Sequence, residues 1–245
     1  MCKSKIFVLT LVFLAIASSC AHKSGQNRKE RNHNNRIAQE QSAKPSQNLI
    51  AKKSSNRTQL DGAEIFRRYN SAVFMVYTTD GSNVYQGSGF FIGEDGLAVS
   101  NYHVFKGTGI GAEAIKMPND DTAYKVAEIY QRSEDEDFII FRVDYSNDNY
   151  IPIASRRPEI GQRVFAIGSP RGLENTFSSG EVSQWRGENL MQISALIDHG
   201  SSGGALINEY GEAVGITSGT FADGSQANLN YAWSIDVVKP YVKCE

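Results

Sequence analysis

The segment GSGFFIGEDGLAVSNYHV, residues 87–104, holds the pattern that decides the fold. Two apolar runs flank the dipeptide Asp95-Gly96, and this arrangement predicts a β-hairpin with a tight turn. Similar turn signals recur at Asp80-Gly81, at residues 208–211 and at Asp223-Gly224. Short strands separated by regular turns predict an all-β sandwich or barrel.

The return strand of this hairpin is expected to end at His103, where a rigid strand end would hold a general base. A single histidine is more often a partly buried structural residue, so this position alone carries little weight. The chain contains 4 histidines, which keeps the search for a base short. They are His22, His33, His103 and His199.

An acidic run, residues 133–137, precedes the apolar strand Phe138–Val143. Asp137 stands directly against that strand, where a carboxylate can orient a histidine ring and stabilise its charged form. The alternative is a solvated acidic loop, which fits Glu134, Asp135 and Glu136. Spacing alone does not choose between Asp137 and Asp135.

The run Gly200-Ser201-Ser202-Gly203-Gly204 sets a serine among glycines. Glycines allow the backbone to turn tightly enough to aim several N–H groups at one point. A serine hydroxyl beside such donors suits acyl-transfer chemistry. By itself the run also fits an ordinary turn between two strands.

In the order His103, Asp137 and Ser202, these motifs resemble the chymotrypsin-like serine proteases, and most closely the HtrA (Deg) family. The resemblance runs from about residue 60 to the end of the chain. The segments that carry it are Gly87–Phe90, Ser100–Val104, Asp137, Ala166–Leu173, Ser179–Ser183, Gly200–Gly204 and Tyr231–Ile235.

The resemblance implies a chymotrypsin-like fold of two six-stranded antiparallel β-barrels, divided near residues 145–160. A short N-terminal helix is expected at residues 60–70, with Asp61 as its cap. His103 and Asp137 would lie on the first barrel and Ser202 on the second, with the substrate in the cleft between them. Many relatives form trimers, so the resemblance implies a homo-oligomer, a trimer, for this chain as well. Most relatives carry PDZ domains beyond this point, which we do not expect here.

The implied activity is that of a serine endopeptidase acting on protein or peptide substrates, with no cofactor and no metal. Its catalytic residues would be His103, Asp137 and Ser202. An oxyanion hole would form from backbone N–H groups of Gly200 and Ser202, joined by Ser201. The implied substrate-binding residues are Leu196, Ser218, Gly219, Thr220 and Ala232.

No acidic residue is expected at the base of the specificity pocket, so small or medium apolar side chains are favoured over Arg and Lys. Glutamyl endopeptidases share the fold but use a late histidine, and none follows His199. The chain departs from the HtrA pattern at Ser201 (usually Asn), Ala205 (often Pro) and Asp198 (often Asn). None of these departures removes a catalytic group.

Residues 1–20 have a basic start, a short apolar run and small residues before Cys20, which is typical of a secretory signal. Because a cysteine follows the small residues, we expect a bacterial lipoprotein signal, with Cys20 lipidated as the first mature residue. Ordinary signal cleavage near the same place is the alternative. Of the 3 cysteines, Cys244 would then stand alone, which excludes an internal disulfide.

Residues 21–58 are rich in Lys, Arg, Asn, Gln and Ser, and such a segment buries too little apolar surface to fold. We expect a disordered basic linker, either a solvated spacer or one attracted to anionic lipid. The chain as a whole has 25 basic and 27 acidic residues, so the expected protease domain, residues 59–245, is acidic. Nucleic-acid binding is therefore not expected of this exported chain.

These features together predict a protein of the bacterial cell envelope, anchored by lipid and facing the periplasm or the outside. Its substrates would be unfolded or misfolded envelope proteins. One alternative is a lipid-anchored peptide-binding or chaperone-like protein that uses a protease fold, although binding alone needs no Ser202 hydroxyl. An inert envelope lipoprotein is a third possibility, and it leaves the ordered motifs unexplained.

Overall fold

A computed structural model describes residues 50–51, 58–109, 111–220 and 229–244 of the chain. The expected signal segment, Cys20 and most of the expected linker lie outside these residues. The described helices are α1 (Gly62–Tyr69) and α2 (Tyr102–Phe105), with short 3₁₀ turns η1 (Asn70–Ala72), η2 (Pro170–Gly172), η3 (Ile235–Val237) and η4 (Lys239–Tyr241). The strands are β1 (Ile50–Ala51), β2 (Val73–Thr79), β3 (Val84–Phe91), β4 (Leu97–Ser100), β5 (Ala114–Lys116), β6 (Ala123–Tyr124), β7 (Val126–Ser133), β8 (Phe138–Val143), β9 (Arg163–Gly168), β10 (Thr176–Arg186), β11 (Leu190–Ile193), β12 (Ala205–Asn208), β13 (Ala213–Thr220), β14 (Asn230–Ser234) and β15 (Lys243–Cys244).

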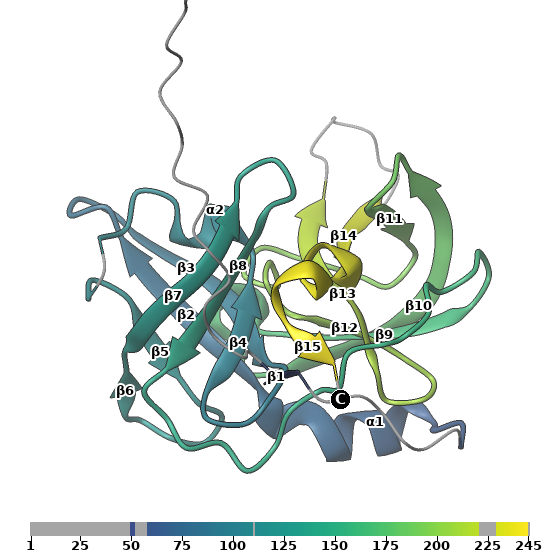
Figure 1. The fold of residues 1–245 in the computed structure, drawn as a ribbon, viewed down its shortest axis with the longest axis horizontal. Coiled ribbons are helices and arrows are strands. Elements are labelled where there is room, and N and C mark those ends of the chain that lie inside the picture. The colour runs from purple at the N-terminus through teal and green to yellow at the C-terminus, as the bar shows by residue number, and fades with distance from the viewer. Residues whose placement is uncertain (1–49, 52–57, 110, 221–228, 245) are drawn as a thin grey trace, which may run out of the picture. The chain divides into compact units, whose positions relative to one another are not determined.

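The C-terminal half forms a closed barrel in the order β10-β11-β14-β13-β12-β9. Every neighbouring pair in it is antiparallel. The six-stranded antiparallel barrel expected for this half is confirmed (Figure 1).

The N-terminal half differs from a closed six-stranded barrel. Its strands form a seven-stranded sheet in the order β6-β5-β2-β3-β4-β8-β7. The two edge strands, β6 and β7, are consecutive in the chain and only Lys125 separates them. The sheet therefore curls until its edges meet through the covalent chain, and not through a further ladder of hydrogen bonds.

The central strands of the first sheet are buried on both faces, which explains their continuous apolar runs. In β8, Phe138 and Ile140 pack in a cluster that also contains Phe165 and Ile167 of the barrel. The alternate residues, Ile139 and Phe141, pack inside the first sheet. A third cluster fills the barrel, with Met191, Leu206 and Ala232 among its members. One core thus joins the two halves, because side chains alternate along a strand.

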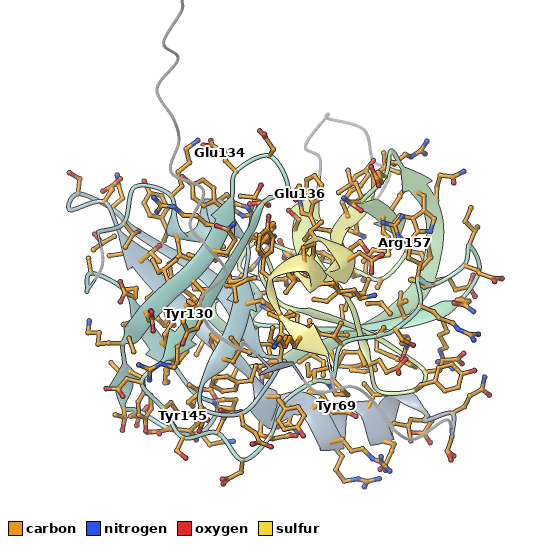
Figure 2. The ribbon with its side chains drawn as sticks, viewed as in Figure 1. Tyr69, Tyr130, Glu134, Glu136, Tyr145 and Arg157 are labelled. Atoms are coloured by element: carbon orange, nitrogen blue, oxygen red, sulfur yellow. The ribbon has the colours of Figure 1, made fainter. Side chains whose placement is uncertain are left out.

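The expected N-terminal helix is confirmed as α1, and the Asp61 side chain caps it by accepting from Glu64 N at 2.8 Å. Ile65 is fully buried against the shared core. Phe66 meets the Phe177 ring of β10 edge-on, so this helix face packs against the C-terminal barrel. Figure 2 shows Tyr69 beside α1, on the side of the ribbon away from Glu134 and Glu136.

Two local expectations are corrected. The return strand of the hairpin ends at Ser100, and His103 lies on the single-turn helix α2. Ile50 and Ala51, which were expected to lie in a disordered linker, form β1 and pair with β15 in parallel. Ile50 and Ala51 are apolar residues in an otherwise polar segment, and β15 offers them an edge. No helix in the described part of the chain is both long and apolar enough to cross a membrane.

Candidate active site

His103 and Asp137 are joined by hydrogen bonds through both the ring and the backbone of His103, in the N-terminal half of the fold. The ring Nδ1 of His103 lies 2.8 Å from Oδ2 and 3.0 Å from Oδ1 of Asp137, and the backbone N–H of His103 donates to the same Oδ1 at 2.9 Å. The carboxylate thereby fixes both the backbone and the ring. Since Nδ1 faces the carboxylate, Nε2 is the ring nitrogen left for chemistry.

Asp137 owes its position to the turn between β7 and β8. Its φ is +46°, a left-handed conformation that few non-glycine residues adopt. The buried Asn101 side chain helps to hold this conformation, because it donates to the Asp137 carbonyl oxygen at 2.8 Å. Only 15% of the Asp137 side chain is exposed, against 47% for His103. The carboxylate is therefore sheltered, while the ring opens toward solvent.

The other acidic residues of this turn bind elsewhere. Glu134 pairs with the Lys106 ammonium, and Glu136 accepts from the Asn189 side chain of the second barrel at 3.0 Å. Figure 2 shows Glu134 and Glu136 at the turn between β7 and β8. Of the two aspartates that spacing left open, the structure brings Asp137 to His103.

The second barrel contributes Ser218 to this pair. Its hydroxyl donates to Asp137 Oδ2 at 2.8 Å. Ser218 lies where the register between β13 and β14 shifts, between Thr217 and Gly219. A β-bulge of this kind bends the strand and redirects a side chain. The bulge thus points Ser218 across the junction of the two halves.

Ser202 lies beside the same bulge. A Cβ built on Gly219 would stand 3.4 Å from Ser202 Oγ, so the hydroxyl approaches the residue next to Ser218. The carbonyl oxygen of Ser202 accepts from Ser88 N of β3 at 2.8 Å. A Cβ on Gly87 would meet this oxygen at 3.1 Å and the Val104 side chain still closer. Ser202 and the helix that carries His103 therefore flank Gly87.

The loop before Ser202 has its carbonyl groups occupied. The Asp198 oxygen accepts from Ser201 N at 2.9 Å, and the His199 oxygen accepts from Arg171 N at 2.8 Å. The Gly200 oxygen accepts from the Ser88 hydroxyl at 2.7 Å. With φ of +92° at Gly200, the turn closed by Ser201 is of type II, which needs a positive φ at that position.

Among residues 199–204 of the described chain, the N–H groups of Gly200 and Ser202 are the two with no hydrogen-bond acceptor. The N–H of Ser201, which was also expected to face an oxyanion, is bound to Asp198 and is turned away. In a trans peptide the C=O and N–H point in opposite directions. Because the His199 carbonyl faces Arg171, the Gly200 N–H faces away from η2.

Residues 87–216 match the model of the family described as "Trypsin-like peptidase domain". The chain belongs to the trypsin-like peptidases. The match contains His103, Asp137 and Ser202, and the resemblance to HtrA (Deg) proteases found in the sequence is confirmed by the relatives.

Two curated relatives illustrate the similarity. The chain is 30% identical over 167 residues to "Protease Do-like 1, chloroplastic" of Arabidopsis thaliana, covering 62% of this chain and 37% of the relative. It is 34% identical over 160 residues to "Probable periplasmic serine endoprotease DegP-like" of Halomonas elongata, covering 62% and 33%. The chain thus spans about a third of the length of these relatives.

A solved structure, that of the serine endoprotease from Yersinia pestis, is also similar. Its TM-score is 0.66 at 28% identity, and the match covers 75% of this chain and 66% of that one. This similarity extends through both halves of the trypsin-like peptidase fold described above.

The expected substrate-binding residues of this trypsin-like peptidase have different surroundings. Gly219 borders Ser202, and Ser218 binds Asp137. Ala232 is fully buried in the barrel core. Leu196 is 64% exposed and lines a cavity of about 520 Å³ on the side of η2. Thr220 ends strand β13, and its side chain is outside the described part.

That cavity has Arg171 and Asp198 among its lining residues. Arg171 Nε lies 2.8 Å from Asp198 Oδ2. Two hydrogen bonds to the Asp198 carboxylate hold the pKa of Asp198 below its usual value. The bond from the His199 N–H has the larger effect and the bond from Arg171 the smaller. The pair joins η2 to the loop before Ser202.

In the described part of this trypsin-like peptidase, no group of three or more His, Cys, Asp or Glu side chains is placed to hold a metal ion. Sequence reasoning missed the side chains that support the loop, above all Gln86, Ser88 and Arg171. The Ser88 position falls inside a recognised motif, which was a usable signal. Gln86 gave none.

Proposed function

We propose that this protein is a serine endopeptidase that uses Ser202 as nucleophile, His103 as general base and Asp137 to hold the base. One observation carries the proposal. The loop at Ser202 turns its carbonyl groups away and leaves the N–H groups of Gly200 and Ser202 without acceptors, while Ser218, next to the Gly219 that borders the Ser202 hydroxyl, binds the carboxylate that holds the His103 imidazole. Acyl transfer needs this combination of nucleophile, base and oxyanion donors.

In the first half of the reaction, Ser202 Oγ attacks the carbonyl carbon of the scissile peptide bond while His103 Nε2 takes the hydroxyl proton. The N–H groups of Gly200 and Ser202 stabilise the negative oxygen that forms. His103 then gives the proton to the leaving amine, and the acyl group stays on Ser202. Asp137 keeps the Nδ1 proton facing itself throughout, which fixes the tautomer.

In the second half, water attacks the acyl-enzyme and His103 takes its proton. Collapse of the second oxyanion breaks the bond to Ser202, which regains the proton from His103. The new carboxylic product leaves, and the resting site is restored.

The proposed substrates are unfolded or misfolded envelope proteins. The relative from Halomonas elongata is named a probable periplasmic serine endoprotease, which supports the envelope as the place where the substrates are met. Pairing of residues 218–220 with an extended substrate chain is supported by the course of strand β13, which borders Ser202 at Gly219. We propose a preference for small or medium apolar residues before the cleaved bond.

We further propose that the protein is held in the bacterial envelope by lipid on Cys20, facing the periplasm or the outside. The support is the sequence of residues 1–20. Mass spectrometry of the membrane fraction should find the chain starting at a lipid-modified Cys20. An unmodified mature N-terminus would contradict this assignment.

A fluorophosphonate probe tests the site directly, because it reacts only with an activated serine. We expect the full-length protein to be labelled at Ser202, located by peptide mass spectrometry. Labelling should disappear in His103→Ala and persist in His199→Ala, because the hydrogen-bond partners of Asp137 in the described part of the chain are Asn101, His103 and Ser218, and not the His199 ring. Labelling that survives His103→Ala would contradict the proposed mechanism. If labelling is absent even with an unfolded protein added, the site is a binding site.

A further inference from the structure

Two side chains of β3 reach from the first sheet to the loop of Ser202. Gln86 and Ser88 are two residues apart and therefore lie on one face of the strand. Gln86 Nε2 donates to the Ser169 carbonyl at 2.8 Å, and lies 3.4 Å from the Gly200 carbonyl. The Ser88 hydroxyl accepts from Ser169 N at 2.9 Å while donating to the Gly200 carbonyl.

The same glutamine also holds the far end of η2. Its Oε1 accepts from Gly172 N at 3.1 Å. Gln86 therefore bonds Ser169 on one side of Arg171 and Gly172 on the other. Between these two anchors, Arg171 has a φ of +53°, which is unusual for a residue with a side chain. Such a conformation persists only where the surroundings fix it.

This arrangement controls the direction of one oxyanion donor. Arg171 N donates to the His199 carbonyl, and that carbonyl shares a trans peptide with the Gly200 N–H. Rotating this peptide would break the bond to Arg171 and turn the Gly200 N–H out of the site. Gly200 also fits closely against Gln86, since a Cβ there would overlap Gln86 Oε1.

We propose that Gln86 is a positioning residue, which sets η2 so that the Gly200 N–H points into the oxyanion hole. The inference rests on the proposed function, since it assigns the means by which that site is held ready. Gln86 does not touch the reacting atoms and acts through Ser169, Gly172 and Arg171.

The chemistry requires an amide at this position. The side chain must donate to the Ser169 carbonyl and accept from Gly172 N. A carboxylate only accepts, and a thioether does neither well. Gln86→Met keeps the length and removes both bonds, whereas Gln86→Glu turns an acceptor toward three carbonyl oxygens, those of Gly87, Ser169 and Gly200. Glu should therefore be the more harmful substitution.

Peptide hydrolysis separates positioning from general stability. Oxyanion donors act in the transition state, so we expect kcat of full-length Gln86→Met to fall about tenfold or more, with KM changed less than twofold. Gln86→Glu should fall further. The control is Gln184→Met, an exposed strand glutamine whose Oε1 accepts from Trp185 N, just as Gln86 Nε2 donates to the carbonyl of its neighbour Gly87. It should retain the parent's kcat.

Hydrogen–deuterium exchange gives a readout that needs no activity. Peptides covering residues 169–173 and 198–204 should exchange faster in Gln86→Met than in the parent or in Gln184→Met. Unchanged exchange in both segments, or an active parent whose kcat survives Gln86→Met, would overturn the proposal. The proposed function fails separately. If residues 169–173 and 198–204 exchange more slowly in the parent than in Gln86→Met, but the parent neither hydrolyses peptides nor reacts with the fluorophosphonate probe, the proposed function is contradicted and the positioning role of Gln86 is not.

Discussion

The Ser218 hydroxyl donates to Asp137 Oδ2 at 2.8 Å, and this bond crosses from the barrel to the first sheet. Asp137 holds His103, while Ser218 sits on the strand that borders Ser202. The Asp137 carboxylate therefore receives its hydrogen bonds from both His103 and Ser218 only when the two halves of the fold are packed together. The bond thus links correct packing of the two halves to the geometry of the active site.

Removing this hydroxyl should weaken catalysis without abolishing it. In Ser218→Ala, Asp137 keeps both donors from His103 and loses the third. A hydrogen bond to a charged group contributes about 1.5 kcal/mol, so kcat should fall about tenfold. Steady-state hydrolysis of a peptide measures it. Ser183→Ala, an exposed serine of β10, serves as the control, and equal kcat values for the two variants would contradict the assigned role.

Asp137→Asn should be far more damaging. The amide can present its NH₂ group to the ring and so favour the wrong tautomer of His103, which in related triads lowers kcat about ten-thousandfold. Asp135→Asn is the matched control, because it makes the same change two residues away in the same turn. Comparable losses in the two variants would mean that the sheltered carboxylate is not the one that serves the base.

The contrast between these two aspartates shows where sequence reasoning stopped. The hairpin and the cap at Asp61 follow from patterns a few residues long, since local turns and alternation dictate them, whereas the barrel of the second half was implied by the resemblance to the HtrA family. Asp137 is selected by a left-handed backbone and by donors from two distant segments. Spacing along the chain contains neither.

Gln86 was beyond prediction for a related reason. Its partners are backbone atoms, 83 residues away at Ser169 and 114 away at Gly200. Because every residue has a carbonyl oxygen, the residue types at Ser169 and Gly200 give no sign that Gln86 binds there. Likewise, apolar spacing predicts the strands of the first sheet, yet not that its edges β6 and β7 meet through the chain at Lys125.

Gly203, next to Ser202, should tolerate no side chain. Its φ is +89°, and a Cβ would overlap both the Ser88 carbonyl and the Ser100 hydroxyl. Left-handed strain costs about 1–2 kcal/mol and overpacking about 1–3 kcal/mol more. Gly203→Ala should therefore lose about 3 kcal/mol in urea unfolding. Gly187→Ala, with φ of +69° and open space around its Cβ, should lose only about 1 kcal/mol. Equal losses would show that backbone strain alone decides the cost.

The Arg171–Asp198 pair predicts a stability difference that depends on pH. Hydrogen bonding to His199 N and Arg171 lowers the pKa of Asp198 from its usual 3.8, so the stabilisation is complete above pH 3.8 and is lost as the pH falls through the lower folded value. Asp198→Asn should thus be less stable than the parent at neutral pH. Because the Asp198 side chain is 45% exposed, the difference should not exceed about 1 kcal/mol.

Urea unfolding at several pH values measures this difference. The difference in the free energy of unfolding between the parent and Asp198→Asn should stay constant from neutral pH down to about pH 3.8, the usual pKa of an aspartate, and shrink below that pH. It should also diminish with added salt. Asp148→Asn, a change at an exposed aspartate, corrects for the altered net charge. A difference that already vanishes in mild acid would mean that the Asp198 pKa is not lowered in the folded protein. One that persists below pH 3.8 at high salt would mean that the side-chain shape of Asp198, and not its charge, holds the loop before Ser202.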